Sequence, residues 1–317
     1  MALTPLGGEC VFSSEVGEEE RQTYFRNFGE FPSSDITETP VSTAPAHELL
    51  TAGFPCQPFC RAGLKQGFSD ARGELFFEVV RFARHHRPAV LLLENVPHLK
   101  YIDGGAALAT VIAELEAIGY LHHHRLLSSR NVVPQDRLRL YIVCFRNPAH
   151  HDAFSWPERL LAPPEKVVPP APCLRQVLEP EASVPADCTL SARQWEKLQE
   201  KLRVAKSTVR IVDRDGPART LIASYRNPSS YFSEFVGNES ESAAVRAGTL
   251  AQLTTAPRFF TVRECARLQG FPEDFVLKWT GQQNPNRLYH QMGNAVSPAA
   301  VALIGQAILD TGALDET

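Results

Sequence analysis

Several features are absent from this 317-residue sequence, and each absence excludes a class of protein. The longest apolar runs, 90–93 and 140–145, are far shorter than the roughly 18 residues that a membrane-spanning helix needs. The first nine residues lack the basic and apolar regions of a signal peptide. The seven cysteines contain no Cys-x-x-Cys pair, so neither a disulfide framework nor a four-cysteine zinc site is expected. We therefore expect a cytoplasmic protein with no membrane association and no metal.

An overall positive charge is also missing, since the formal net charge is −4. The charge is unevenly distributed along the chain. Residues 193–226 hold nine basic and four acidic residues, whereas residues 1–40 hold eight acidic residues and two basic ones. Bulk charge therefore argues against nucleic-acid binding by the whole chain, but the basic segment is suited to phosphates.

The first half of the sequence alternates between strand-like and helix-like patterns. Short apolar runs of strand length occupy 9–14, 48–53, 89–93 and 138–145. Apolar residues at helical spacing occupy 74–86 and 106–118, and Gly119 closes the second of these helices. This alternation predicts an α/β fold with a parallel sheet covered on both faces. Ligands of such sheets lie beyond the carboxyl ends of the strands, which places the chemistry directly after Gly53 and Leu93.

The second half has a different composition and predicts a second domain. Six prolines between Pro157 and Pro172 form a stiff, non-helical connector. Further on, Thr261 to Glu264 has capping-box form and opens a short helix that ends before Gly270, and Ser297-Pro298 starts a final helix that ends at Leu309. We expect a first domain of residues 1–160, completed by 290–317, and a second domain of residues 161–289.

Cys56 and Glu94 follow two of the predicted strands. Cys56 sits in a Gly-Phe-Pro-Cys-Gln-Pro-Phe turn, where a thiol that ionises would act as a nucleophile, although a lone cysteine is more often a buried apolar residue. Glu94 ends a Val-Leu-Leu-Leu strand. A carboxyl group beside apolar walls has a raised pKa, which suits a general acid. If the two strands are adjacent, these residues form one site.

Other candidate residues carry weaker signals. Gln135, Arg137 and Arg139 alternate along an extended segment and point to one face, as a solvated edge strand would also allow. Glu15 ends the predicted strand 9–14, where an acid accepts hydrogen bonds from ribose hydroxyls. The consecutive histidines 122–124 would point to opposite faces of a strand, so no metal site is expected there. Three cysteines in apolar segments are expected in the core: Cys10, Cys144 and Cys265.

Five segments resemble, in order, the motifs of the cytosine-5 DNA methyltransferase family. They are Phe-Pro-Cys-Gln at 54–57, Glu-Asn-Val at 94–96, Gln-Asp-Arg-Leu-Arg at 135–139, Arg-Glu-Cys-Ala-Arg-Leu-Gln-Gly-Phe-Pro at 263–272 and Gln-Met-Gly-Asn-Ala-Val at 291–296. The resemblance covers nearly the whole chain. It implies a Rossmann-like, S-adenosylmethionine-dependent methyltransferase sheet with a smaller, mostly irregular or β target-recognition domain.

The resemblance also implies roles for individual residues. The Cys56 thiolate would add to C6 of a cytosine flipped out of the duplex, Glu94 would bind N3 and the exocyclic amine, and Arg139 would bind O2, supported by Arg137 and Gln135. The implied cofactor-binding residues are Glu15, Asp35, Ile36, Pro55, Leu75, Asn294 and Ala295. The implied DNA-binding residues are Gln57, Arg210, Arg214, Arg219, Thr220 and Leu221. The glycine-containing segment 60–73 resembles the family's mobile loop.

The implied reaction transfers a methyl group from S-adenosylmethionine to C5 of cytosine in a specific duplex sequence and leaves S-adenosylhomocysteine, with no metal. The implied partners are double-stranded DNA and a cognate restriction endonuclease. The implied location is the cytoplasm, in association with the nucleoid, for a protein of prokaryotic or phage origin.

Two departures from the family pattern are visible. Val16 stands where the family usually has an aromatic residue, and no glycine-rich loop of the form Asp-x-Phe-x-Gly-x-Gly-Gly is found. We expect either that the gene product starts upstream or that a separate polypeptide supplies the first strand. Two alternatives follow: a non-catalytic or complementing DNA-binding subunit, and a transfer-RNA cytosine-5 methyltransferase.

Overall fold

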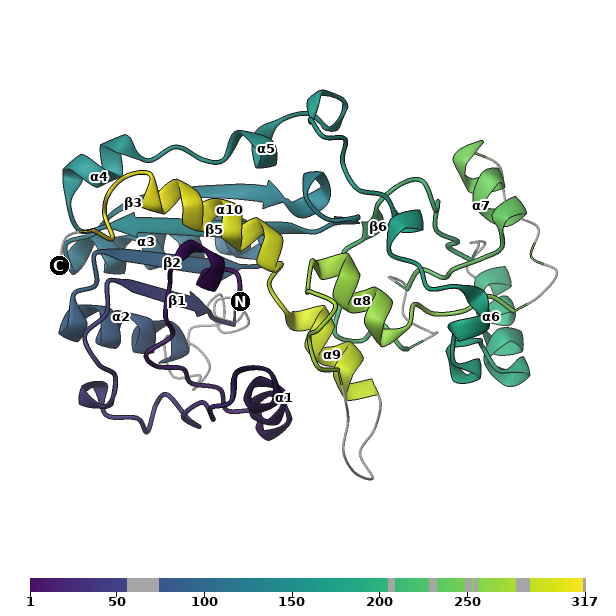
Figure 1. Cartoon of the computed structure of the whole chain (residues 1–317), viewed down its shortest axis with the longest axis horizontal. Helices are drawn as coiled ribbons and strands as arrows, with labels where there is room; N and C mark the ends of the chain where they lie inside the picture. Colours follow the sequence, from purple (N-terminus) through teal and green to yellow (C-terminus); the bar gives the residue numbers. More distant parts are fainter. Residues whose placement is uncertain are drawn as a thin grey trace. The chain divides into compact units, whose positions relative to one another are not determined.

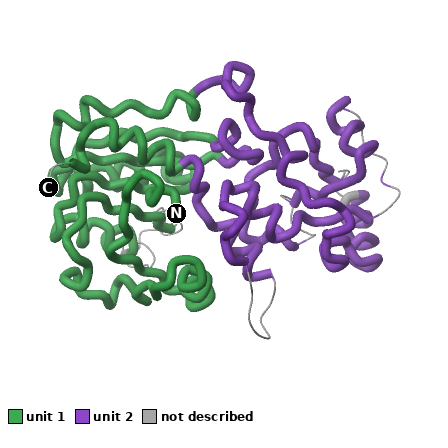
Figure 2. Tube along the Cα trace, in the orientation of Figure 1, with its two compact units in different colours: residues 1–128, 138–161, 301–317 green, residues 129–137, 162–300 purple. Residues whose placement is uncertain are grey.

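The computed structural model describes residues 1–55, 74–204, 209–227, 233–248, 253, 256–277 and 286–315. The chain divides into two compact units (Figure 2). Unit 1 comprises residues 1–128, 138–161 and 301–317, and unit 2 comprises residues 129–137 and 162–300. Each unit is described by itself below.

Unit 1 is built around a four-stranded sheet with the strand order β1-β2-β5-β3. The strands are β1 (Leu49–Gly53), β2 (Val90–Asn95), β3 (Leu121–Ser128) and β5 (Leu138–Phe145). The helices are α1 (Glu18–Phe28), α2 (Glu74–His86), α3 (Ala106–Ala117), α4 (Pro148–Ala153), α5 (Glu158–Leu161) and most of α10 (Pro298–Leu309), as Figure 1 shows. The predicted strands at 48–53, 89–93 and 138–145 and the helix at 106–118 are confirmed within a few residues. Gly119 follows α3 with a φ of 90°, as a closing glycine does.

The sheet is mixed, so the prediction of a parallel sheet is wrong. β1 and β2 pair in parallel, with Gly53 opposite Glu94, but β5 runs antiparallel to both β2 and β3. An apolar run shows that a strand is buried and does not show its direction. The pairing of β1 with β2 still brings the carboxyl ends of these two strands to one edge.

Both faces of the sheet are covered, as predicted. On one face, Leu91, Leu93, Leu140 and Ile142 pack with apolar residues of α2 and α3 in a single core cluster. On the other face, the alternate residues, including Val90 and Val143, are also fully buried. Figure 1 shows α10 in front of β5, and its Ile304 and Ile308 are fully buried.

The predicted strand at 9–14 does not form, which is a second correction. Only Ser14 makes a bridge, to Ser33, and residues 9–13 have no ladder partner among the described residues. Cys10 is consequently exposed rather than part of the core. Cys144 and Cys265 are buried, as expected, because each lies in a regular element packed on its neighbours.

Unit 2 is mainly irregular and contains several helices. They are α6 (Ala192–Val204), α7 (Glu239–Arg246), α8 (Val262–Gln269) and α9 (Asn286–Asn294). Its ladder consists of two short strands, β4 (Gln135–Asp136) and β6 (Ala218–Arg219), which pair in parallel. The predicted capping box at Thr261 and the closing Gly270, with a φ of 84°, are both confirmed for α8.

The stretch Asn286–Leu309 is long and apolar enough, by length and composition alone, to cross a membrane. The structure divides it into α9 and α10, separated by residues 295–297. Helices of 9 and 12 residues are about 14 and 18 Å long, well below the roughly 30 Å of a bilayer core. Leu288, Met292 and Ile304 are buried in the protein, as is typical of core helices.

Candidate active site

Glu94 and Arg139 form an ion pair in unit 1. Glu94 lies next to the carboxyl end of β2 and Arg139 lies on the neighbouring strand β5, with Arg139 Nε 3.0 Å from Glu94 Oε1. Both side chains are largely buried, at 17% and 10% exposure respectively. Arg139 Nη1 also donates to the carbonyl of its neighbour Leu138 at 2.7 Å. The antiparallel pairing of β2 with β5 thus brings two predicted catalytic residues together.

This pairing defines the charge state of the two groups. Burial lowers the pKa of the Arg139 guanidinium, and the adjacent Glu94 carboxylate opposes that shift. A guanidinium at this distance stabilises the ionised carboxylate. Glu94 is therefore part of a charged pair with Arg139. The sequence alone predicted a carboxyl group that faces apolar side chains.

Asn95 ties the end of β2 to the segment that leads to Cys56. Its side-chain Nδ2 donates to the carbonyl of Phe54 at 2.7 Å, and its Oδ1 accepts from the backbone N–H of Val96 at 2.8 Å. Asn95 is 3% exposed, so this contact is protected from water. Sequence reasoning missed this role, although an asparagine directly after a strand-end acid is a signal that would have found it.

The predicted nucleophile Cys56 and the predicted DNA contact Gln57 lie outside the described residues, as does the predicted mobile loop 60–73. Phe54 is buried against Phe76 of α2, with ring centroids 5.2 Å apart, and Pro55 is half-buried. Gly53 lies opposite Glu94 in the parallel ladder. The chain thus leaves β1 toward Cys56 from a position beside Glu94.

Gln135 and Arg137 lie in unit 2 and are almost fully buried, at 0% and 2% exposure. The Arg137 guanidinium donates to three backbone carbonyls, those of Leu221, Gly293 and Ala295, at 2.7 to 2.9 Å. Gln135 donates to the carbonyl of Leu268 and accepts from the N–H of Leu221. We name these two side chains the backbone clamp. The clamp joins three of the sequence motifs inside unit 2.

Thr220 and Leu221 are held next to the clamp. The Thr220 hydroxyl donates to the carbonyl of Asp136 at 2.8 Å. On the other side of this segment, Glu234 accepts from the N–H of Arg219 at 2.7 Å and lies 3.4 Å from its guanidinium. Burial raises the pKa of Glu234, and hydrogen bonding and charge at Arg219 oppose that shift. The backbone of 219–221 is therefore fixed from both sides.

The predicted DNA-binding arginines differ in their surroundings. Arg219 is 61% exposed in spite of its contact with Glu234. Arg214 is 13% exposed, donates to the carbonyl of Gly237 and pairs with Glu239 at 3.1 Å and Glu181 at 3.4 Å. Arg210 is half-buried. Arg214 thus serves unit 2 internally, whereas Arg219 is open to a ligand.

Five predicted cofactor-binding residues lie in unit 1: Pro55, described above, and Glu15, Asp35, Ile36 and Leu75. The bridge between Ser14 and Ser33 places the segments of Glu15 and Asp35 side by side. Glu15 Oε1 accepts from the N–H of Gly17 at 2.8 Å; Glu15 is exposed and Asp35 is half-buried. The hydroxyl and N–H of Thr37 lower the pKa of Asp35. The carbonyl of Ile36 accepts from Arg81 at 2.8 Å, and Leu75 lies half-buried at the start of α2.

The other two predicted cofactor residues lie in unit 2: Asn294 is the last residue of α9, and Ala295 follows it. Asn294 Nδ2 lies 3.4 Å from His290 Nδ1, and the Ala295 carbonyl is bound by Arg137. Gly293 packs so tightly that a Cβ there would overlap the backbone of Ile222 and Ala223. The final motif thus packs directly against the residues that follow Thr220 and Leu221.

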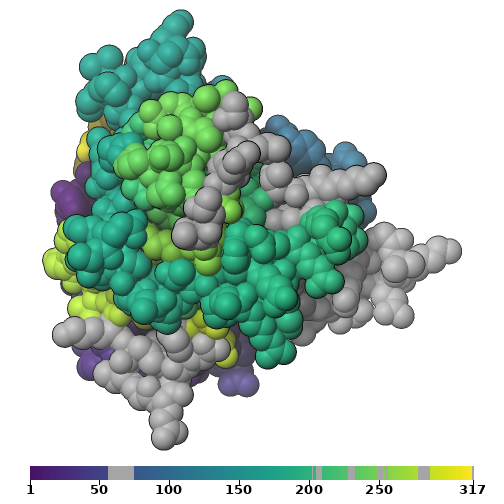
Figure 3. Space-filling model, turned by 90° about the vertical axis from the view of Figure 1, so that its right-hand side faces the viewer, coloured from purple at the N-terminus to yellow at the C-terminus, as the bar shows by residue number. Residues whose placement is uncertain are grey.

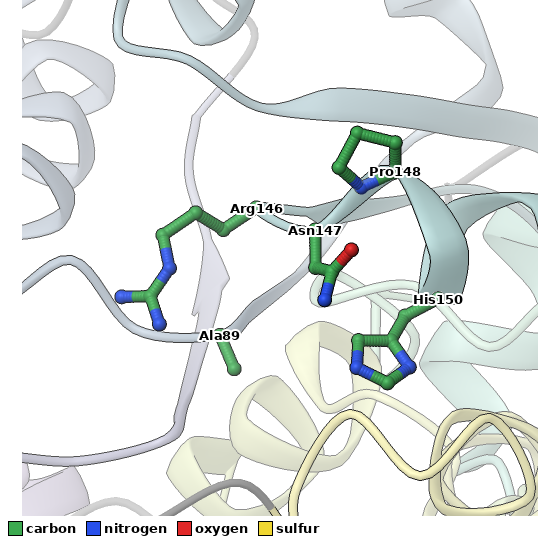
Figure 4. A pocket seen from close by; sticks show the side chains of 5 residues that line it. All are labelled: Ala89, Arg146, Asn147, Pro148 and His150. Atoms are coloured by element: carbon green, nitrogen blue, oxygen red, sulfur yellow. The ribbon is translucent and has the colours of Figure 1, made fainter.

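A cavity of about 340 Å³ lies in unit 1 at the amino end of β2, the opposite end from Glu94. It is lined by Ala89, Arg146, Asn147, Pro148 and His150. Figure 4 shows Asn147 and His150 on the same side and the Arg146 guanidinium extending away from them. Each polar side chain is hydrogen-bonded to a backbone group. Arg146 donates to the carbonyl of Arg87, Asn147 accepts from the N–H of Ala149, and His150 bonds to the carbonyl of Thr311. The cavity is separate from every predicted site residue.

Histidine, cysteine and acidic side chains form no group that could hold a metal within the described ranges. His122 and His124 project from the same face of β3, where their rings stack with centroids 5.3 Å apart. Burial lowers the pKa of both rings.

Comparison with known proteins gives one consistent family. The model of the C-5 cytosine-specific DNA methylase family matches residues 1–310. The type II methyltransferase M.DsaV of Dactylococcopsis salina is 35% identical over 96% of this chain and 80% of its own length. The type II methyltransferase M.HpaII of Haemophilus parainfluenzae is 34% identical over 98% of this chain and 86% of its own length.

Solved structures show the same fold at lower identity. A DNMT2 variant of Spodoptera frugiperda superimposes with a TM-score of 0.71, covering 97% of this chain and 95% of that protein at 20% identity. The Dnmt2 methyltransferase of S. pombe gives a TM-score of 0.69 at 18% identity, covering 98% and 93%. These structures share the fold, and the match of the family model to residues 1–310, together with the relatives of 34–35% identity, shows that the chain belongs to the C-5 cytosine-specific DNA methylase family, whose members are cytosine-5 DNA methyltransferases that use a methyl donor.

Proposed function

We propose that this chain methylates C5 of a flipped cytosine in duplex DNA with S-adenosylmethionine as donor, and that Cys56, Glu94 and Arg139 carry the reaction. The observation that supports this proposal most directly is the Glu94–Arg139 ion pair beside the backbone that leads to Cys56. The pair is buried, charged and located at the edge of the sheet where ligands of such folds bind.

Each of the three side chains has a defined task. The Cys56 thiolate forms a bond to C6, and the electron pair of the C5–C6 double bond then becomes available at C5. Glu94 must first take up a proton from solvent; it then donates that proton to N3, which compensates the negative charge that develops on the ring, while its other carboxyl oxygen accepts a hydrogen bond from the exocyclic amine. Arg139 donates to O2 and holds Glu94 in place. Loss of the C5 proton and departure of the thiolate restore the aromatic ring.

The donor binding site is proposed for Glu15 and Asp35 in unit 1. S-adenosylmethionine, when bound, supplies an electrophilic methyl group. Glu15 uses one carboxylate oxygen for the N–H of Gly17, and within the described residues its other oxygen has no partner, which suits a ribose hydroxyl. Asp35, next to it across the Ser14–Ser33 bridge, suits the amine of adenine. The chemistry of these donors and acceptors fits a nucleoside.

The DNA-contacting part is proposed for unit 2, where Arg219 and Thr220 follow β6. Relatives with 34–35% identity are named type II methyltransferases, which supports DNA as the substrate over transfer RNA. It also supports a role in a restriction–modification system with a cognate endonuclease.

The role of Glu94 is tested by Glu94→Gln. We expect a loss of about two to four orders of magnitude in kcat with much less change in DNA binding, because the amide cannot protonate N3. Glu116→Gln is the control, since Glu116 lies on α3 beside His122 and should leave kcat unchanged. A tenfold or smaller loss in the Glu94 variant would assign Glu94 to structure alone.

The role of Cys56 is tested by covalent trapping. Duplexes carrying 5-fluorocytosine should form a denaturation-resistant complex with the wild-type chain when S-adenosylmethionine is present, because fluorine at C5 cannot leave as a proton. Cys56→Ser should abolish both trapping and methyl transfer, since an alkoxide is too scarce near neutral pH. Normal turnover by this variant would remove Cys56 from the mechanism.

A further inference from the structure

Several arginine–carboxylate pairs of unit 2 share one arrangement, in which the arginine is the more buried partner. In four of them the carboxylate side chain is 61 to 65% exposed and the arginine 13 to 46%: Arg175–Glu239, Arg214–Glu181, Arg226–Asp187 and Arg267–Glu273. Glu239 begins α7, which lies on the face of unit 2 that Figure 3 shows. In such a pair the carboxylate faces water and the arginine supports the fold.

The pair of Glu234 and Arg219 has the reverse arrangement. The Glu234 side chain is 14% exposed and that of Arg219 is 61% exposed, with Glu234 Oε1 3.4 Å from Arg219 Nε. The other carboxylate oxygen of Glu234 accepts from the backbone N–H of Arg219 at 2.7 Å. Burying a carboxylate costs solvation free energy that an exposed pair retains, so a pair that only stabilised the surface would not need a buried acid. Glu234 thus holds Arg219 by its backbone and by Nε, which leaves the outer nitrogens Nη1 and Nη2 for a ligand.

The backbone that carries Arg219 is fixed on both sides of it. The N–H of Ala218 donates to the carbonyl of Pro134 at 2.9 Å, and the N–H of Leu221 donates to Gln135 Oε1 at 3.1 Å. Ala218 and Leu221 are both buried. Arg219 therefore extends from a rigid segment, and a ligand that binds it does not have to order the backbone first.

The carboxylate of Glu234 decides which kind of ligand suits Arg219. It offsets the charge of Arg219, and Arg210, whose charge also acts on Glu234, is half-buried. Phosphate binding depends on net positive charge, which Glu234 reduces at this point. A base edge is neutral and is recognised instead by the placement of donors and acceptors. The Nη1 and Nη2 donors match N7 and O6 of guanine, which are both acceptors, whereas adenine has an amino donor in place of O6.

We infer that Glu234 is a positioning residue for base recognition, which holds Arg219 so that Nη1 and Nη2 bind N7 and O6 of one guanine in the DNA site. This inference rests on the proposed function, which makes duplex DNA the substrate. Glu234 acts through Arg219 and not on the DNA itself. A lysine at position 219 would keep the charge but would lack the planar, two-pronged donor group that guanine requires.

The experiment removes one guanine acceptor at a time. The methylated site is identified first, by bisulfite sequencing of DNA from a bacterial host without cytosine methylation that expresses the chain. Duplexes with this site then carry 7-deazaguanine, which lacks N7, in place of each guanine in turn. For the wild-type chain we expect kcat/KM to fall by about 10- to 150-fold at the guanine that Arg219 binds, the usual range for a hydrogen bond to a charged group.

Three variants show which residues produce this response. Arg219→Lys should lose the response to 7-deazaguanine at that one guanine. Glu234→Gln keeps the size of the side chain and an acceptor for the N–H of Arg219 but removes the charge beside Nε, so the response there should fall to about threefold or less. Its kcat at saturating DNA should stay within about twofold of the wild-type value, because the change affects binding. Glu273→Gln, which removes the carboxylate of another arginine pair of unit 2, is the matched control and should respond as the wild type does.

A wild-type response of Arg219→Lys at every guanine would overturn the inference, since a charge alone would then suffice at position 219. A wild-type response of Glu234→Gln at every guanine, or an equal loss by this variant on all duplexes, would reduce Glu234 to a structural role.

If circular dichroism shows that Glu234→Gln is unfolded, Glu234→Asp is measured instead. Its shorter side chain cannot contact the N–H and Nε of Arg219 together, so the same loss of response is expected, and a full response contradicts the inference. Absence of methylated cytosine in the host DNA contradicts the proposed function, and the inference fails with it. Methyl transfer with an unaltered guanine response in the variants contradicts only the inference.

Discussion

Glu264→Gln should destabilise unit 2 strongly, because Glu264 is a fully buried carboxylate with four hydrogen-bond donors around it. Two come from Arg258, at 2.9 and 3.0 Å, and the other two are the backbone N–H groups of Thr261 and Glu179, each at 2.8 Å. Glu264 is 0% exposed and the Arg258 side chain 6%. A glutamine at this position would direct its NH₂ group at donors instead of acceptors.

The expected cost follows from burial. Removing one partner of a buried ion pair typically costs about 3 to 5 kcal/mol in the free energy of unfolding. In Glu264→Gln the buried Arg258 guanidinium keeps only one of its two carboxylate partners, Glu181 at 3.2 Å, which is 62% exposed. For a folded body of about 150 to 250 residues, 1 kcal/mol corresponds to roughly 2 to 4 °C in Tm, so Tm should fall by about 6 to 20 °C.

Glu273→Gln is the matched control. Glu273 also forms a two-pronged pair with an arginine, Arg267, at 2.7 and 2.9 Å, but it is 65% exposed. An exposed pair contributes at most about 1 kcal/mol, so Tm should fall by no more than about 4 °C. Thermal denaturation monitored by near-ultraviolet circular dichroism measures both variants. Equal shifts in the two would refute the reasoning, because burial would then have no part in the cost.

Three further predictions concern other parts of the chain. Asn95→Ala should lower the free energy of unfolding by about 1 to 3 kcal/mol and also slow methyl transfer, because the Phe54 carbonyl loses its donor next to Cys56; denaturation and a methyl-transfer assay measure the two effects. Gly293→Ala should destabilise unit 2 by about 1 to 3 kcal/mol in a denaturant titration, since backbone atoms of Ile222 and Ala223 cannot move aside as a side chain would. Burial lowers the pKa of His122 and His124 from the ordinary value of 6.5, so the stability that their neutral rings contribute is complete above that pH and is lost as the pH falls through 6.5. Replacing both histidines with glutamine should therefore reduce the drop in Tm between about pH 7.5 and about pH 5.5.

The elements that the sequence predicted well are those whose pattern is local. The helix at 106–118 and the strands at 48–53 and 138–145 have apolar residues that become buried whatever their partners are. Thr261 and Gly270 were recognised because a capping box and a closing glycine act within one turn of helix.

The errors concern features that depend on partners distant in sequence. Residues 9–14 have the composition of a strand, but only Ser14 finds a bridge partner. The direction of β5 is not encoded in its apolar run, and it proved antiparallel.

The candidate site shows the same limit. Arg137 and Arg139 were expected on one face of an extended segment, yet the chain passes from unit 2 to unit 1 between residues 137 and 138. Arg137 therefore binds backbone carbonyls of unit 2, whereas Arg139 pairs with Glu94 in unit 1. The Glu94–Arg139 pair itself required knowledge of strand order, and so did the contact from Asn95 to Phe54.

The backbone clamp has a consequence for how such enzymes can be altered. Gln135 and Arg137 bind the N–H and carbonyl groups of Leu221 and the carbonyls of Leu268, Gly293 and Ala295, and they bind no side chain among these contacts. Every amino acid provides the same main-chain groups. A recognition segment taken from another methyltransferase can therefore be inserted as a cassette after Leu221, provided that its backbone enters along the same path, and the donor of the cassette need not share the side chains at the junction.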